Sequence, residues 1–317
     1  MPEVVSPIVS ICIPAYKPDY FEECLQSCLM QRYPFQELVI SDDCPTDAIE
    51  QIAKKYAAEP RIRYYRNIPS LGLARNYVRL AELASCEWLK FMDDDDILQP
   101  NGLALLMEKA AGDVAVVCGG QREFYEDGKI VEKLSDIPDS TGGVEYLLAH
   151  FRKRPIVGFS KILIRKAAFA EVDFDHDPFI SEKMMNLDRL IGGYACLLGK
   201  VVRQPAVVCA YRRHSSSYSK KTDADIWKYS VEYVYSIGGK LCDKNIISKS
   251  SLQRWQRQMV SWELRCAMDT LLRRGDGAAV KEFISYIWMR FSFGGIWHAI
   301  KMNNFTKIIN KIFWQNS

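Results

Sequence analysis

The first 118 residues alternate short apolar runs with segments of helical periodicity, and this alternation constrains the fold more than any other sequence feature. Residues 9–14 predict a first strand that ends at a proline, and apolar side chains then recur at helical spacing over 21–29. Further strands are expected at 37–41, 62–65, 88–92 and 114–118. Helices are expected after 46 or 47, over 73–84 and after 100. Such alternation predicts an α/β fold, a mostly parallel sheet with helices on both faces.

The pattern changes twice along the rest of the chain. Residues 119–222 are less regular and carry Gly-Gly pairs and several prolines. From about residue 223 the sequence is mostly helical in pattern and rich in tryptophan, tyrosine and basic side chains, with Asp276-Gly277 or Gly294-Gly295 as expected breaks. We therefore divide the chain into 1–118, 119–222 and a helical C-terminal extension at 223–317.

Net charge, cysteine spacing and hydropathy bear on the partners and location of the protein. The net charge of +3 favours neither nucleic acid nor a membrane as a partner, so electrostatic arguments rest on local clusters. The ten cysteines form no Cys-x-x-Cys pair, which favours buried thiols in a reducing compartment. The first residues lack the pattern of a signal peptide, and no charge-free apolar stretch reaches the roughly 20 residues that span a bilayer. We expect a cytoplasmic protein.

Polar clusters follow three of the predicted strands. They are Pro14–Lys17, Ser41–Asp43 and Asp93–Asp96. In an open parallel sheet, ligands bind beyond the carboxyl ends of the strands, where loops and helix N-termini converge. The three clusters together therefore predict one binding site.

The acidic run Asp93–Asp96 follows the apolar strand predicted at 88–92. Four carboxylates in one turn repel one another unless a cation neutralises them or some are protonated. Oxygen ligands select hard cations, so Mg²⁺ or Mn²⁺ is the simplest neutralising partner. The alternative is a solvated acidic turn that caps the helix after it.

Four motifs carry a resemblance to a known family. They are Val9-Ser-Ile-Cys-Ile-Pro-Ala-Tyr16, Leu38-Val-Ile-Ser-Asp-Asp43, Gly72-Leu-Ala-Arg-Asn76 and Phe91-Met-Asp-Asp-Asp-Asp96. Their order and spacing resemble the inverting family-2 glycosyltransferases of the GT-A fold, of the bacterial surface-polysaccharide type. The resemblance implies a nucleotide-sugar-binding half at 1–118 and an acceptor-binding half at 119–222.

The resemblance assigns roles to the first half of the site. Pro14 and Tyr16 would line the nucleoside pocket, and Asp42 would accept a hydrogen bond from the base. Arg75 would lie near the base or diphosphate, although a solvated helix face is an equal alternative. Asp93 and Asp95 match the Asp-x-Asp pair of the family, with Asp95 as the main ligand of Mn²⁺ or Mg²⁺. Asp94 would face the ribose, and Asp96 would begin the next helix.

The second half of the chain has a weaker match. The family carries an acidic pair about two dozen residues before a Tyr-Arg-x-His segment, here Tyr211–His214. This spacing makes Asp188 the expected catalytic base. Leu187 precedes it where the family has an acid, so Glu182 is a rival for the role. The structural alternative is that Asp188 caps a helix or forms a salt bridge. His214 would bind the metal or a phosphate oxygen, or else be structural.

Two further segments have alternative interpretations. Residues 215–221, with Lys220 and Lys221, form either a loop that closes over the donor or a linker. The aromatic and lysine-rich residues 283–313 suit either a helix at the inner face of the plasma membrane or packing against the catalytic domain.

The resemblance implies transfer of a sugar from a nucleoside-diphosphate sugar, with a UDP-sugar favoured, to an acceptor hydroxyl. The acceptor would be a glycan or lipid-linked glycan of cell-surface polysaccharide synthesis. A sugar-phosphate nucleotidyltransferase and a non-catalytic nucleotide-sugar-binding protein remain alternatives. The former would need a Gly-rich, Arg-containing loop after the first strand, which Pro14–Lys17 does not provide. No nucleic-acid partner is expected.

Overall fold

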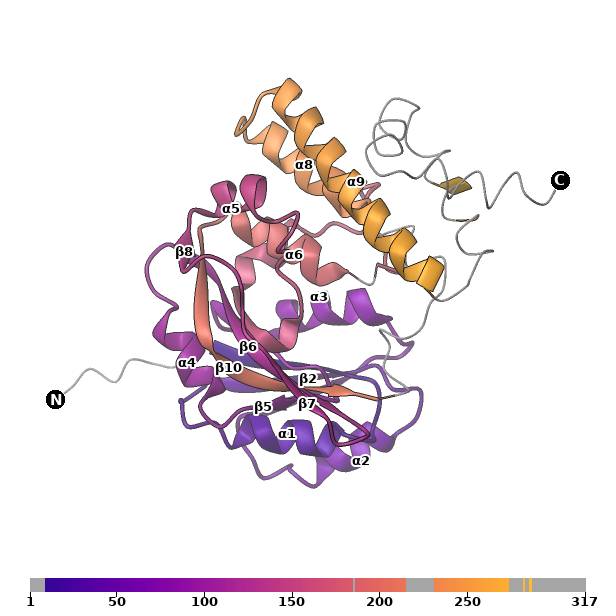
Figure 1. The fold of residues 1–317 in the computed structure, drawn as a ribbon. Helices are drawn as coiled ribbons and strands as arrows, with labels where there is room; N and C mark the ends of the chain where they lie inside the picture. Colours follow the sequence, from indigo (N-terminus) through magenta and orange to yellow (C-terminus); the bar gives the residue numbers. More distant parts are fainter. Residues whose placement is uncertain (1–8, 185, 215–230, 274–281, 283–284, 287–317) are drawn as a thin grey trace. The chain divides into compact units, whose positions relative to one another are not determined.

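The computed structural model describes residues 9–184, 186–214, 231–273, 282 and 285–286 (Figure 1). The chain forms two compact units. The first comprises residues 1–173 and 187–217, and the second comprises residues 174–186 and 218–317. All four aspartates of the acidic run, Asp188 and His214 belong to the first unit.

A ten-stranded sheet forms the centre of the first unit, and its main path has the order β3-β2-β1-β4-β9-β6-β10-β5. The four parallel strands at one side are β1 Val9–Ala15, β2 Glu37–Asp42, β3 Ile62–Arg66 and β4 Trp88–Phe91. The other strands are β5 Ile97–Leu98, β6 Val114–Tyr125, β7 Ile130–Lys133, β8 Ser140–Thr141, β9 Ile162–Arg165 and β10 Lys200–Arg213. Strand β9 is antiparallel to both β4 and β6, whereas β10 is parallel to β6.

Helices cover both faces of this sheet, with α1 and α2 on one side and α3 and α6 on the other (Figure 1). The helices of the first unit are α1 Phe21–Leu29, α2 Ala48–Lys54, α3 Leu73–Leu83, α4 Gly102–Glu108, α5 Gly143–Ala149 and α6 Leu187–Cys196. All seven residues of β1 are buried. Helix α1 contributes Phe21, Cys24, Leu25 and Cys28 to the same core cluster, as its helical spacing predicts. The predicted α/β fold, with a mostly parallel sheet, is confirmed.

Local sequence patterns did not predict the strands that the structure contains after residue 118. The sheet is continuous across this position, because β6 runs from Val114 to Tyr125, so the two predicted halves share one sheet. The region 119–222 also contains β10, a 14-residue strand that pairs along β6. Asp96 does not begin a helix, because β5 follows it directly and α4 starts at Gly102.

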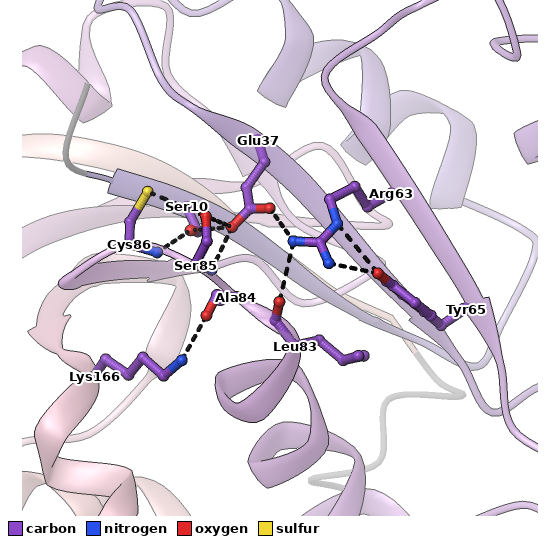
Figure 2. A network of polar contacts seen from close by, with 9 residues as sticks. All are labelled: Ser10, Glu37, Arg63, Tyr65, Leu83, Ala84, Ser85, Cys86 and Lys166. Atoms are coloured by element: carbon purple, nitrogen blue, oxygen red, sulfur yellow. Dashed lines mark hydrogen bonds and ion pairs between the residues drawn. The ribbon is translucent and has the colours of Figure 1, made fainter. Parts of the chain in front are cut away.

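A buried polar network joins the amino ends of the parallel strands (Figure 2). Glu37, at the start of β2, is 4% exposed. Its Oε1 accepts hydrogen bonds from Ser10 Oγ at 2.7 Å and from the backbone N–H of Ser85 at 2.6 Å. Its Oε2 pairs with Arg63 of β3 at 2.5 Å. One carboxylate therefore links β1, β2, β3 and the segment before β4.

The second unit contains α8 Tyr233–Asp243 and α9 Lys249–Arg273, which confirms the helical prediction for these residues. Tyr233 of α8 donates a hydrogen bond to Glu263 of α9 at 2.9 Å, and both side chains are buried. No helix among the described residues is long and apolar enough to cross a membrane. The expected breaks at 276–277 and 294–295, the lysines at 220 and 221 and most of 283–313 lie outside the described residues.

Candidate functional site

Asp93, directly after Met92 at the end of β4, is held from three sides. Its Oδ1 accepts a hydrogen bond from the hydroxyl of Tyr77 on α3, and its backbone N–H donates to Ser160 Oγ at 3.2 Å. Cys24 Sγ lies 3.3 Å from its carbonyl oxygen. Burial, and then the charge of Asp95, raises the pKa of Asp93 to about 6, while the Tyr77 hydrogen bond opposes this rise.

Asp94 joins the acidic run to the end of β1. Its Oδ2 accepts hydrogen bonds from the backbone N–H groups of Tyr16 and Lys17, both at 2.7 Å. Burial and the charge of Asp95 raise the pKa of Asp94 to about 7, and the two N–H donors lower it. The side chain of Tyr16 is 49% exposed at this edge, whereas Pro14 is buried within β1. Two of the predicted polar clusters are thus in direct contact.

Asp95 lies beside His214 at the end of β10. The distance from His214 Nε2 to Asp95 Oδ2 is 2.9 Å, and His214 is 2% exposed. The ring of His214 packs edge-on against Tyr20 with 5.3 Å between ring centroids. Arg212 donates from Nε to the carbonyl oxygen of Asp95 at 3.0 Å and pairs with Glu23. His214 follows Asp95 by 119 residues in the sequence, and β10 places it beside the acidic run.

Asp96 is completely buried and accepts a hydrogen bond at Oδ1 from the backbone N–H of Arg212 at 3.0 Å. Burial, and then the charges of Asp93 and Asp95, raises the pKa of Asp96 well above its usual range. Asp96 thus forms a structural link between the acidic run and β10.

Asp42 and Asp43 end β2 at the same edge. Asp42 accepts a hydrogen bond from the backbone N–H of Cys44 at 2.8 Å and from the Tyr64 hydroxyl at 2.5 Å, and burial raises its pKa. Asp43 holds the loop before α3. It accepts hydrogen bonds from Asn67 Nδ2, Ser70 Oγ, Leu71 N and Gly72 N at 2.7–3.1 Å.

Arg75 and Asn76 begin α3 next to this loop. Asn76 is 3% exposed and donates from Nδ2 to the carbonyl oxygen of Ser41 at 3.1 Å, so its role is structural. Arg75 is half-buried in the first turn of the helix. The amino end of α3, with its positive dipole, therefore faces the edge where the strands end.

Asp188 is in the first turn of α6 and lies near the acidic run. Its Oδ2 accepts a hydrogen bond from the backbone N–H of Gly158 at 2.7 Å, and its Oδ1 accepts from the N–H of Arg189 at 2.8 Å. Burial raises the pKa of Asp188, and these two N–H donors, with the Arg189 charge, oppose the rise. Its charge in turn contributes to the raised pKa values of Asp93 and Tyr77. The rival Glu182 belongs to the other compact unit.

The residues that hold these carboxylates in place carry no recognisable signal in the sequence. Tyr77 is buried, and its ring stacks on Phe159 with 4.5 Å between centroids. Ser160 lies 67 positions after its partner Asp93. No motif or periodicity links such distant positions, so only the folded chain reveals them.

The side chains at this edge fit a divalent cation that is also held by phosphate. Among the described residues, no three His, Cys, Asp or Glu side chains are already grouped as metal ligands. Mg²⁺ sites commonly use one or two protein ligands plus substrate phosphate oxygens. The adjacent Asp95 carboxylate and His214 imidazole are two groups of the types that bind such cations.

Comparisons with known proteins match the first half of the chain to a family. The model of the family described as "Glycosyl transferase family 2" matches residues 10–173. The GalNAc(5)-diNAcBac-PP-undecaprenol beta-1,3-glucosyltransferase of Campylobacter jejuni is 28% identical over 177 residues, which are 52% of this chain and 55% of that protein. Matches to three further curated relatives cover 14%, 65% and 32% of the lengths of those proteins, so the chain corresponds to only part of each.

Solved structures show the same fold. TarS 1–349 of S. aureus in complex with UDP-GlcNAc superposes with a TM-score of 0.63 at 17% identity, over 88% of this chain and 81% of that one. The mannosyltransferase PcManGT of Pyrobaculum calidifontis, in complex with GDP-Man and Mn²⁺, gives a TM-score of 0.51 at 14% identity, over 99% and 89% of the two chains.

Proposed function

The chain belongs to glycosyl transferase family 2, and from this premise we propose that it transfers a sugar from a nucleoside-diphosphate sugar to an acceptor hydroxyl, with inversion at the anomeric carbon. The observation that carries the proposal is the convergence of Asp93–Asp95, His214 and Asp188 at the carboxyl ends of the strands. This is the edge where open α/β sheets bind nucleotides.

The nucleoside would bind between the ends of β1 and β2. Pro14 and Tyr16 would line its pocket, and Asp42 would accept a hydrogen bond from the base. Arg75, at the positive end of α3, would lie near the base or the diphosphate. A UDP-sugar is the favoured donor, and the fold shared with a UDP-GlcNAc-bound TarS supports this choice.

A divalent cation, Mn²⁺ or Mg²⁺, would neutralise the departing diphosphate when bound. Asp95 and His214 would hold it, with Asp93 beside them and Asp94 facing the ribose. The Mn²⁺ in the related mannosyltransferase structure supports the choice of ion. Tyr77, by donating to Asp93, would keep that carboxylate ionised and oriented.

Asp188 would act as the general base. Its carboxylate would take the proton of the acceptor hydroxyl as the hydroxyl oxygen attacks the anomeric carbon from the face opposite the diphosphate. The N–H groups of Gly158 and Arg189 fix the orientation of this carboxylate. Burial raises its pKa and so makes it a stronger base than an exposed aspartate.

The acceptor would be a glycan or a lipid-linked glycan in cell-surface polysaccharide synthesis, at the cytoplasmic face of the membrane. The name of the Campylobacter relative, which includes a PP-undecaprenol-linked glycan, supports this acceptor class. Residues 283–313 would then provide the membrane contact.

Replacing the base tests the proposal. A panel of UDP-, GDP- and dTDP-sugars, with and without Mn²⁺, first identifies the donor by its stabilisation of the fold in a thermal-shift assay. Asp188→Asn should then lower sugar transfer from the labelled donor by about 10²–10⁴-fold and leave the thermal shift unchanged. Glu182→Gln is the matched variant and should retain transfer. Transfer that survives in Asp188→Asn but is lost in Glu182→Gln would reassign the base.

A further inference from the structure

A lysine is buried in the strand that leads to the acidic run. Lys90, in β4, is 0% exposed. Its ammonium donates hydrogen bonds to the carbonyl oxygens of Phe91 and Ser160, both at 2.6 Å, and lies 3.5 Å from the carbonyl oxygen of Phe159. Since its N–H groups bind backbone oxygens inside the protein, Lys90 does not itself contact substrate.

Burying the ammonium of Lys90 costs free energy of folding. Burial lowers the pKa of Lys90, against the attraction of charges that include Asp93 and Asp96. Removing an ammonium from water costs several kcal/mol before its partners offset it, and an apolar side chain of similar length often gives an equally stable core. Stability alone therefore does not account for a lysine here.

The turn that Lys90 binds contacts both parts of the site. It is the 3-10 helix η1, Phe159–Lys161, which follows Gly158. Within it, Ser160 Oγ accepts the backbone N–H of Asp93 at 3.2 Å. The N–H of Gly158, just before it, donates to Asp188 Oδ2 at 2.7 Å. The turn thus bridges the acidic run and the expected base.

We propose that Lys90 is a positioning residue: its ammonium fixes η1 against the end of β4 and so sets the separation between Asp188 and a donor held at the acidic run. The inference rests on the proposed function. Without the ammonium, the carbonyls of Phe91 and Ser160 lose their buried donor and η1 can shift. A shift of about 1 Å in such a group can cost on the order of 10²-fold in rate.

Lys90→Met tests this role, because methionine keeps the length and removes the donors. We expect kcat for transfer to fall about 10- to 100-fold while the donor dissociation constant, measured by calorimetry, changes by less than about threefold. Hydrogen exchange of the amides at 158–161 should become faster than in the wild type. Lys166→Met is the matched control, since Lys166 also donates to a backbone carbonyl, Ala84 at 2.6 Å, at the opposite end of the strands (Figure 2). It should keep the wild-type kcat.

A second variant decides the matter if Lys90→Met fails to fold. Lys90→Gln removes the ammonium and shortens the side chain, but its amide keeps a hydrogen-bond donor in the buried strand. It should show the same loss of kcat with unchanged donor affinity. An unchanged kcat in the folded variant, or a loss of donor affinity parallel to that of kcat, overturns the inference. Absence of product from the wild-type protein instead overturns the proposed function.

Discussion

Burial and neighbouring charge oppose the ionisation of single carboxylates at the site. Asp93 and Asp94 are ionised at neutral pH only at a cost, because burial and neighbouring charge raise their pKa values to about 6 and about 7. A carboxyl whose pKa is higher in the folded state stabilises the fold at low pH, and this stabilisation is lost as the pH rises through the folded pKa. The charged forms of Asp93 and Asp94 therefore reduce the stability of the fold.

Asp94→Asn should relieve this cost. The amide oxygen can still accept from the N–H groups of Tyr16 and Lys17, but the charge is gone. In metal-free buffer with a chelator, the variant should gain about 1–3 kcal/mol of unfolding free energy over the wild type. The gain should grow from pH 4 to about 7 and stay level above that.

Urea unfolding across this pH range measures the difference. The exposed Asp127→Asn serves as a control and should show no such growth. A wild type that is more stable than Asp94→Asn in metal-free buffer at pH 8 would contradict the idea that burial and charge repulsion make the Asp94 carboxylate destabilising.

At the scale of the elements, the two ends of the parallel strands differ in the residues that they carry. The carboxyl ends of β1, β2 and β4 carry the candidate site, while the amino ends are joined by the Glu37 network (Figure 2). Burial raises the pKa of Glu37, but its donors, including the backbone N–H of Ser85 and the guanidinium of Arg63, outweigh burial and lower the pKa below its usual value. Its stabilising effect is therefore present above the unfolded pKa and is lost as the pH falls through the folded pKa.

Glu37→Gln should separate stability from activity. It removes the charge that pairs with Arg63, and hydrogen bonds to a charged group contribute about 1.5–3 kcal/mol, so the unfolding free energy at pH 7 should fall by about that amount. The deficit should shrink in acid, where the wild-type carboxylate is itself protonated. Donor affinity and kcat should stay within about twofold, because the network lies at the end of the sheet opposite to the site.

Chemical denaturation at pH 7 and pH 4, with transfer assays on the folded protein, measures both effects. Glu59→Gln is the comparison, because Glu59 pairs with Arg61 on the surface; it should cost less. A Glu37→Gln protein with wild-type stability would show that neutral hydrogen bonds suffice in the network.

Across the whole molecule, local patterns predicted the parallel strands and helices of the first third, because each of these elements has its own hydrophobic periodicity. The same patterns placed Asp42 and the acidic run at one edge, since parallel strands end together. They could not predict Lys90 as a donor to Ser160, because β9 enters the sheet antiparallel between β4 and β6 and brings η1 with it. Such non-local pairings leave no periodicity in the sequence.

The eight buried thiols of the first unit provide a test of its cooperativity. All ten are free, and the eight buried ones, from Cys12 to Cys209, belong to this unit. Burial raises the pKa of Cys118 and Cys209 to about 12, so little reactive thiolate forms at pH 8. With a chromogenic disulfide reagent, we expect the half-buried Cys242 and Cys266 to react first and the other eight only after unfolding.

If the ten-stranded sheet unfolds as one unit, these eight thiols should react with a single rate that slows when the donor and Mn²⁺ are added. Mass spectrometry of partly labelled protein distinguishes this from local opening, because a cooperative unit yields only molecules with all eight thiols either free or modified. A ladder of partly modified species would show that the sheet opens in parts, with the strands at either side of β9 as separate units.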